Sequence, residues 1–197
     1  MSTATPTRLH LVRHGPTHAK AMVGWSDLPA DLSDTAALAR LSAHLPDGAR
    51  VISSDLSRAV TTADAIQGTR ARLPHDPRLR EMNFGAWELR RFKEVEAEDP
   101  HRIRAFWEQP GDNAPPDGES WNDLRARADT AIDALIAAHP GGDLVVVAHF
   151  GLILCQIQRA LAIPPSQAFG QKIDNLSLTE ITRDGDGWSL GRVNHCP

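Results

Sequence analysis

The stretch that most constrains the fold of this 197-residue chain is the run GGDLVVVAH at 141–149. Three consecutive valines without polar alternation are typical of a strand buried on both faces, as in a parallel sheet covered by helices. Shorter apolar runs come earlier, at 9–13 and 49–54. Helical patterns separate the three runs, and strands that alternate with helices predict an α/β fold. We therefore expect a three-layer α/β/α sandwich with a mostly parallel central sheet.

Capping and turn residues predict where the first two helices begin. Ser33 or Asp34 is expected to cap a helix that the turn residues PDG then stop. Ser54 or Asp55 is expected to cap a second helix, which runs to about Gly68. The second helix follows its predicted strand directly, whereas the loop GPTHAKAMVGWSDLPAD, rich in turn residues, is expected between the first strand and the first helix.

The second half of the chain contains three more helical segments and a hairpin. Pro100 is expected to break an irregular helical stretch at 88–109, and Ser120 to begin a long helix that ends at Ala138. An apolar helix is predicted over 151–162, ended by a Pro-Pro pair. The last two alternating stretches, NLSLTEI and WSLGRV, predict a terminal hairpin with an Asp-Gly turn.

Composition narrows the class of protein and its partners. With 41% hydrophobic and 23% charged residues, the chain is expected to form one domain over 1–197 rather than a disordered or fibrous structure. A formal net charge of −4 gives no reason to expect a nucleic-acid or membrane partner. The start of the chain has no signal-peptide pattern, and no apolar run is long enough to span a membrane. Two cysteines, Cys155 and Cys196, favour a reducing cytoplasm over a disulfide framework.

Charged and titratable residues stand where the predicted strands end. Arg13 and His14 close the first strand, Arg58 lies in the first helical turn after the second, and His149 ends the valine strand. In a parallel sheet the carboxyl ends of the strands lie at one edge, where ligands bind. Since charged groups at a buried strand end are costly unless paired, this edge is expected to hold an anion.

Arginine and histidine together suit phosphoryl transfer. The guanidinium fork matches phosphate oxygens bidentately, and a neutral imidazole can attack phosphorus to form a covalent intermediate. The sequence has no HExxH, no paired-cysteine zinc pattern and no Walker glycine loop, so we expect neither a metal nor a cofactor.

Each residue taken alone also has an ordinary structural interpretation. Arg58 could form a salt bridge with Asp55 or Asp64 on its own helix, and His149 could be a hydrogen-bonded core histidine. What favours function is the placement of three such signals at three strand ends.

Six segments, in order, resemble the histidine phosphatase superfamily, which has the phosphoglycerate-mutase-like fold. They are LVRHGPT, GWSDLPADLS, SSDLSRAVTTA, LREMNFGAWE, PDGESWNDLRARA and VVVAHFG. The resemblance implies that His14 becomes phosphorylated, that Arg13, Arg58 and His149 hold the phosphoryl group, and that Glu81 is the general acid and then the base.

The chain departs from the family pattern in ways that bear on substrate. Lys20 stands where many members have Asn, Phe150 replaces a small residue after the second histidine, Leu154 replaces an Arg and Thr61 a Gln. We expect Thr17, Lys20 and Phe150 to line the phosphate or substrate site.

The resemblance implies a metal-independent phosphatase that hydrolyses a small phosphomonoester. The chain is shorter than the glycolytic mutases, and it has Phe84 and Pro16 where those mutases carry Tyr and Glu. A mutase remains one alternative, and a catalytically silent phosphate-binding or scaffold protein is another. A short phosphatase of the α-ribazole-phosphate type looks similar in layout. The sequence identifies neither the physiological substrate nor whether the chain forms a homodimer.

Overall fold

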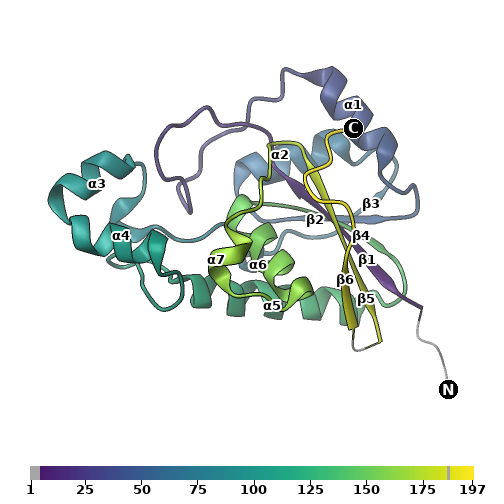
Figure 1. Ribbon diagram of the computed structural model, residues 1–197. Helices are drawn as coiled ribbons and strands as arrows, with labels where there is room; N and C mark the ends of the chain where they lie inside the picture. Colours follow the sequence, from purple (N-terminus) through teal and green to yellow (C-terminus); the bar gives the residue numbers. More distant parts are fainter. Residues whose placement is uncertain (1–4, 186) are drawn as a thin grey trace.

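The computed structural model describes residues 5–185 and 187–197, and within them the strands form one mixed sheet. Its order is β3-β2-β4-β1-β5-β6, as Figure 1 shows. The strands are β1 (Thr7–Arg13), β2 (Arg50–Ser53), β3 (Ala71–Arg72), β4 (Asp143–Ala148), β5 (Leu178–Asp184) and β6 (Gly187–Leu190). β3, β2, β4 and β1 are parallel to one another, whereas β5 runs antiparallel to both of its neighbours, β1 and β6. The three apolar runs identified in the sequence form β1, β2 and β4, and the prediction that they are parallel neighbours is confirmed.

Helices cover both faces of the sheet, which confirms the three-layer α/β/α prediction. Val145 and Val147 of β4 pack on one side, with the residues of α1 (Thr35–His44) and α2 (Ser57–Ile66). Leu144 and Val146 pack on the other side, with α5 (Trp121–Ala138) and α6 (Phe150–Leu161). Residues 144–148 are fully buried, so the valine run is covered on both faces as its sequence indicates.

The segment between β3 and α5 lies at one side of the layers in Figure 1. It consists of two 3-10 helices and two α-helices: η1 (Pro77–Leu79), η2 (Gly85–Trp87), α3 (Phe92–Glu98) and α4 (Pro100–Glu108). Pro100 is the first residue of α4, so it breaks the helical stretch as predicted. Phe106 of α4 is buried in the main core and anchors this segment.

Most predicted helix starts are confirmed by capping contacts. The side chain of Asp34 accepts a hydrogen bond from the N–H of Ala37, and Ser120 forms a capping box with Asp123. The prediction for α2 is wrong, because its N-cap is Leu56 and makes no side-chain hydrogen bond.

The two residues expected to cap α2 are engaged elsewhere. The hydroxyl of Ser54 is hydrogen-bonded to His149, and the carboxylate of Asp55 pairs with Arg80. A short helix, α7 (Pro165–Ala168), also begins at the proline pair that was expected only to end α6.

The chain ends in the predicted hairpin, in which β5 pairs with β6. Asp186 of the expected Asp-Gly turn lies outside the described residues. Residues 1–4, which begin the segment without a signal-peptide pattern, also lie outside them. Within the described part of the chain, no helix is long and apolar enough to cross a membrane.

Candidate active site

Strand ends bring the predicted basic residues to one edge of the sheet. Arg13, the last residue of β1, pairs in register with Ala148 of β4, so the two strands finish level. His14 and His149 follow directly, and their ring centroids lie 5.0 Å apart. Arg58 enters from the first turn of α2. All four residues therefore gather at the carboxyl ends of parallel strands, as the sequence predicts.

His14 is held in one tautomer by the backbone that follows it. Its Nδ1 lies 2.6 Å from the carbonyl oxygen of Gly15, which can only accept, so Nδ1 carries the proton. In the neutral ring, Nε2 then keeps its lone pair. Glycine fits at position 15 without a clash, whereas a Cβ there would lie 2.7 Å from the Leu32 side chain, which would have to shift.

The surroundings of His14 oppose its protonation. Burial, together with the positive charges of Arg58 and Arg13, lowers the pKa of His14 to about 3, although the hydrogen bond to Gly15 acts in the opposite direction. Since the ordinary value is about 6.5, the ring is neutral at physiological pH.

Arg58 is almost fully buried, and its guanidinium is held by the loop between β1 and α1. Its two terminal nitrogens donate to the carbonyls of Gly24 and Ser26, at 2.6 and 2.9 Å. Among the described contacts, Asp55 pairs with Arg80 and not with Arg58. Asp64 pairs with Arg72, so neither carboxylate of the ordinary interpretation pairs with Arg58 in the described contacts, and that interpretation is wrong.

Arg13 is anchored less completely than Arg58. Its NH1 donates to the carbonyl of Ile173 at 2.6 Å, its Cζ lies 5.4 Å from the centroid of the Phe150 ring, and its buried Nε has no partner in the described residues. Burial lowers the pKa of both Arg13 and Arg58 from the ordinary value.

His149 is completely buried and contacts a serine that follows β2. Its Nε2 lies 2.7 Å from the hydroxyl of Ser54, while its Nδ1 has no partner among the described residues. Burial and the neighbouring His14 keep the pKa of His149 well below its usual value. His149 is thus a buried, hydrogen-bonded histidine that lines neither of the cavities beside His14, and its unpartnered Nδ1 is the ring atom left for a contact with a ligand.

The carboxyl group of Glu81 lies at the N-terminus of α6. It accepts hydrogen bonds from the N–H groups of Gly151, at 3.1 Å, and Met82, at 2.9 Å. A Cβ on Gly151 would collide with the carboxyl oxygen, so glycine is required for this approach. Burial raises the pKa of Glu81 although these hydrogen bonds act against it.

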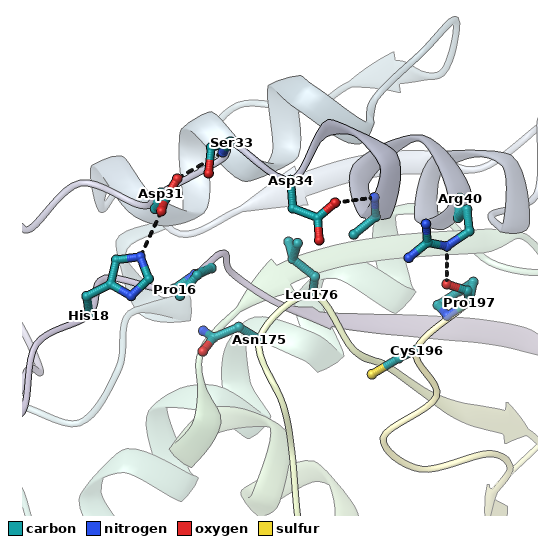
Figure 2. A pocket seen from close by; sticks show the side chains of 11 residues that line it. Pro16, His18, Asp31, Ser33, Asp34, Arg40, Asn175, Leu176, Cys196 and Pro197 are labelled. Atoms are coloured by element: carbon teal, nitrogen blue, oxygen red, sulfur yellow. Dashed lines mark hydrogen bonds and ion pairs between the residues drawn. The ribbon is translucent and has the colours of Figure 1, made fainter.

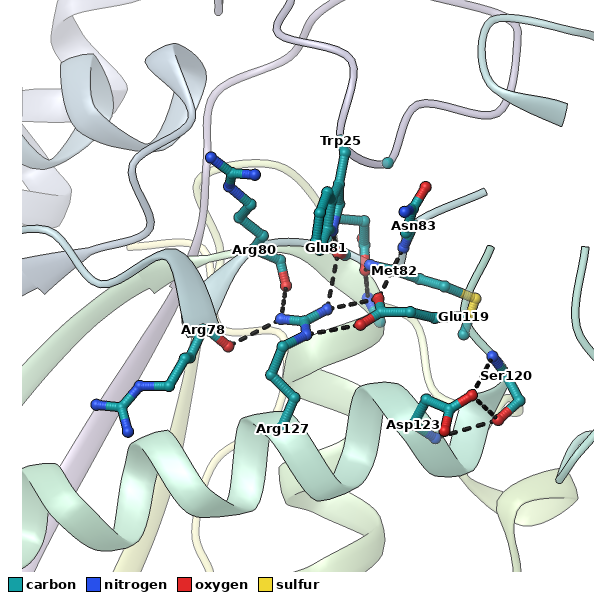
Figure 3. Close-up of polar contacts among 12 residues, drawn as sticks. Trp25, Arg78, Arg80, Glu81, Met82, Asn83, Glu119, Ser120, Asp123 and Arg127 are labelled. Atoms are coloured by element: carbon teal, nitrogen blue, oxygen red, sulfur yellow. Dashed lines mark hydrogen bonds and ion pairs between the residues drawn. The ribbon is translucent and has the colours of Figure 1, made fainter. Parts of the chain in front are cut away.

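The backbone beneath Glu81 is clamped by Arg127 of α5, as Figure 3 shows. The guanidinium donates to the carbonyls of Arg78, Arg80 and Glu81 at 2.8 to 3.1 Å and pairs with the carboxylate of Glu119. The segment that carries Glu81 is thereby fixed to a long helix, although it has no regular structure of its own.

Trp25, in the loop between β1 and α1, holds the same segment from the other side. Its indole N–H donates to the carbonyl of Glu81 at 2.8 Å, and the Cζ atoms of Arg80 and Arg127 lie 4.9 and 5.8 Å from its ring centroid. Glu88 secures the loop by accepting hydrogen bonds from the N–H groups of Gly24, Trp25 and Ser26.

Two adjoining cavities open beside His14. One, of about 290 Å³, is lined by Arg13, His14, Thr17, Ala19, Ala21, Met22, Val23, Arg58, Glu81, Phe84, Trp107 and Phe150. The other, of about 380 Å³, is lined by Arg13, His14, Pro16, Thr17, His18, Ala19, Lys20 and Asn175. Thr17 lines both cavities and Phe150 lines the first, while Lys20 is exposed and lines only the second.

The other departures from the family pattern lie away from these two cavities. Leu154 is fully buried in the core, and the hydroxyl of Thr61 donates to the carbonyl of Ser57 on its own helix. Neither residue lines the cavities beside His14.

A third cavity of about 350 Å³, drawn in Figure 2, continues from the second one past Pro16, His18 and Asn175. Asp31 and Asp34 line it, but Asp31 already accepts from His18 and Asp34 already caps α1. In the described residues, no group of three or more His, Cys, Asp or Glu side chains is arranged to hold a metal ion.

Sequence reasoning missed the residues that position the site. Ser54 stands at the end of β2 and could have been found by the strand-end argument that found His149. Arg127 and Trp25 gave no signal, because their partners are backbone carbonyls distant in sequence. Asn175, which donates to the carbonyl of His14 at 2.8 Å, is brought in only by the antiparallel start of β5.

Comparison with known sequences identifies relatives over nearly the whole chain. The bifunctional protein Rv2228c of Mycobacterium tuberculosis is 32% identical over 92% of this chain and 52% of its own length, so this chain spans about half of that relative. Adenosylcobalamin/alpha-ribazole phosphatase of Salmonella typhimurium is 30% identical, covering 85% of this chain and 86% of its own. The probable phosphoglycerate mutase GpmB of Proteus mirabilis is 26% identical, covering 92% and 87%.

Solved structures share the fold throughout. YhfR of Bacillus stearothermophilus superposes with a TM-score of 0.89 at 27% identity, covering 97% of this chain and 98% of that one. The mycobacterial glucosyl-3-phosphoglycerate phosphatase Rv2419c gives a TM-score of 0.83 at 26% identity, covering 96% and 99%. The phosphoglycerate-mutase-like fold expected from the sequence is confirmed.

These relatives include phosphatases and a probable phosphoglycerate mutase. The family model that matches residues 9–195 is that of the histidine phosphatase superfamily, branch 1. With the histidine at the end of β1, the two arginines and the second histidine all gathered at one sheet edge, the chain belongs to the histidine phosphatase superfamily.

Proposed function

We propose that this protein is a metal-independent phosphatase that hydrolyses a small phosphomonoester through a phosphohistidine on His14. The observation that carries the proposal is the state of His14: a buried, neutral ring whose proton is committed to the Gly15 carbonyl, with Nε2 left as a nucleophile. Arg13 and Arg58 supply the positive charge that a phosphate dianion needs, and His149 adds a further polar contact.

In the first step, the lone pair of His14 Nε2 attacks phosphorus and the bond to the leaving oxygen breaks. The leaving oxygen takes that electron pair and receives the proton of Glu81, whose raised pKa favours the protonated form. The phosphorylated ring becomes a cation, and its Nδ1–H donates a stronger hydrogen bond to Gly15. Arg13 and Arg58 balance the charge on the equatorial oxygens.

In the second step, water attacks the phosphohistidine while the Glu81 carboxylate accepts its proton. The bond between nitrogen and phosphorus breaks, and its electron pair returns to Nε2. Phosphate leaves, with neutral His14 and protonated Glu81 regenerated for the next cycle.

Hydrolysis is favoured over the mutase alternative by the space beside His14. A mutase must exclude water until the phosphoryl group returns to a second hydroxyl. The 380 Å³ cavity that adjoins His14 has room for several waters. The NFGAW segment also has Phe84 where the glycolytic mutases carry Tyr, and the sequence contains no tyrosine at all.

The proposal includes one domain over 1–197 acting on a small phosphorylated molecule, with no nucleic-acid or membrane partner. The family match over 9–195 and the single sheet support the domain assignment. We also keep a reducing cytoplasm as the location, supported by two free cysteines in the described residues. A catalytically silent phosphate-binding protein is the non-enzymatic alternative.

His14→Ala is expected to lower turnover of 4-nitrophenyl phosphate at least about a thousandfold, because it removes the nucleophile. Rapid quench of the wild-type protein with radiolabelled substrate should trap an acid-labile phosphohistidine that the variant lacks. His101→Ala, an exposed histidine on α4, is the matched control and should behave as wild type. Full activity in His14→Ala, or no trapped phosphohistidine during turnover, would contradict the proposal.

Glu81→Gln is expected to slow hydrolysis of an alkyl phosphate by about a hundredfold or more, and of 2,4-dinitrophenyl phosphate by less than about tenfold. Only the poor leaving group needs the proton. In the wild type, kcat/KM for the alkyl ester should fall as pH rises through the pKa of Glu81, because the active form is the protonated one.

The phosphate group of the alkyl ester also titrates near neutral pH, so the pH profile of Glu81→Gln on the same ester isolates the contribution of Glu81. Glu98→Gln, which changes an exposed carboxylate paired with Arg90, is the matched control. Equal losses with both esters would remove Glu81 from the role of general acid.

The hydrolase proposal is tested against the mutase alternative with 3-phosphoglycerate and a catalytic amount of the bisphosphate. Because water has access to His14, we expect free phosphate to accumulate faster than 2-phosphoglycerate. Nuclear magnetic resonance of phosphorus follows both products in one sample. Rapid isomerisation with little release of phosphate would make the protein a mutase.

A further inference from the structure

Resting on the proposed function, we propose that the substrate is the phosphomonoester of an apolar, aromatic alcohol, and that Phe150 sets how large its ring can be. The proposal comes from the two cavities beside His14, which differ in chemistry. The aromatic alcohol is the leaving group, and the reaction at phosphorus is the one proposed above.

The position of Glu81 selects the cavity into which the leaving group departs. Glu81 lines the 290 Å³ cavity and does not line the 380 Å³ cavity that contains Lys20 and His18. A general acid must lie within hydrogen-bond reach of the oxygen that it protonates. The leaving group therefore lies in the 290 Å³ cavity.

The 290 Å³ cavity offers the leaving group few polar partners. Of its lining side chains, the charged and titratable ones are those that the mechanism already uses. Apart from Thr17 at the phosphate end, the remaining side chains are aliphatic or aromatic, with Phe84, Trp107 and Phe150 as the large ones. Beyond the groups that the mechanism uses, Thr17 and the indole N–H of Trp107, these side chains offer no hydrogen-bond partner to a sugar or a carboxylate, whereas a flat apolar ring would gain contact area.

Phe150 is one of the side chains between this cavity and a small apolar one of about 40 Å³. Both are lined by Phe84, Trp107, Phe150 and Glu81, while the small one extends to Trp121 and Phe169 in the core. Phe150 is held in place by Arg13, whose Cζ lies 5.4 Å from its ring centroid. Its side chain therefore closes off the space behind the leaving group.

The test uses non-hydrolysable phosphonates that share the phosphoryl group and differ in the group attached to it. Calorimetric titration of the full chain should show benzylphosphonate binding about tenfold or more tighter than ethylphosphonate. A preference below about twofold overturns the inference. So does 2-carboxyethylphosphonate binding as tightly as benzylphosphonate, which would place the ligand on the Lys20 side.

Phe150→Ala should join the two cavities. The benzyl preference over ethyl should then fall at least about threefold, and 2-naphthylmethylphosphonate should gain relative to benzylphosphonate. Phe150→Leu, which keeps most of the volume, provides the second variant and should lose benzyl preference without the naphthyl gain. Phe92→Ala, an exposed aromatic residue on α3, should keep the wild-type ratios. Unchanged ratios in both Phe150 variants would overturn the role of Phe150.

Failure of this inference is distinct from failure of the proposed function. Turnover of 4-nitrophenyl phosphate that depends on His14, without any benzyl preference, would contradict the inference and leave the phosphatase intact. A benzyl preference without turnover would support the binding site and contradict the phosphatase.

Discussion

The hydrogen bond from the Nδ1–H of His14 to the carbonyl of Gly15 is the contact on which the site depends. It fixes the tautomer, leaves Nε2 as the only basic nitrogen of the ring, and provides an acceptor when the ring becomes a cation. The bond joins two adjacent residues at the end of β1, where a Cβ at Gly15 would lie 2.7 Å from the Leu32 side chain. The N–H of Gly15 donates in turn to the hydroxyl of Thr62 in α2, so the turn is held from a second element.

Burial acts oppositely on the two groups that the proposed reaction needs. It lowers the pKa of His14, which keeps the nucleophile unprotonated, and raises the pKa of Glu81, which favours the acid form. Both forms are neutral, so neither group offsets the positive charge that Arg13 and Arg58 bring to the site. The fold keeps Glu81 in this dry position by clamping its backbone with Arg127 and Trp25.

The sheet and the four basic residues were predictable because they follow from local patterns: an unbroken apolar run, a strand end, and a first helical turn. The roles of Glu81, His14 and the others come from family resemblance, and the geometry supports them without testing them. The start of α2 was mispredicted because Ser54 and Asp55 are good caps that tertiary contacts recruit elsewhere. The contacts of Arg127 with the segment at 78–81 could not be predicted, because every residue has a backbone carbonyl and such contacts leave no pattern in the sequence.

The protonation state of His14 can be measured directly. In the ligand-free protein labelled with nitrogen-15 at histidine, two-bond correlation spectra distinguish the two neutral tautomers and the imidazolium, and His14→Ala assigns the signal. We predict that His14 is neutral with its proton on Nδ1 throughout the range from about pH 5 to pH 8, since its pKa is lowered to about 3. An imidazolium at neutral pH, or a proton on Nε2, would contradict the proposed nucleophile.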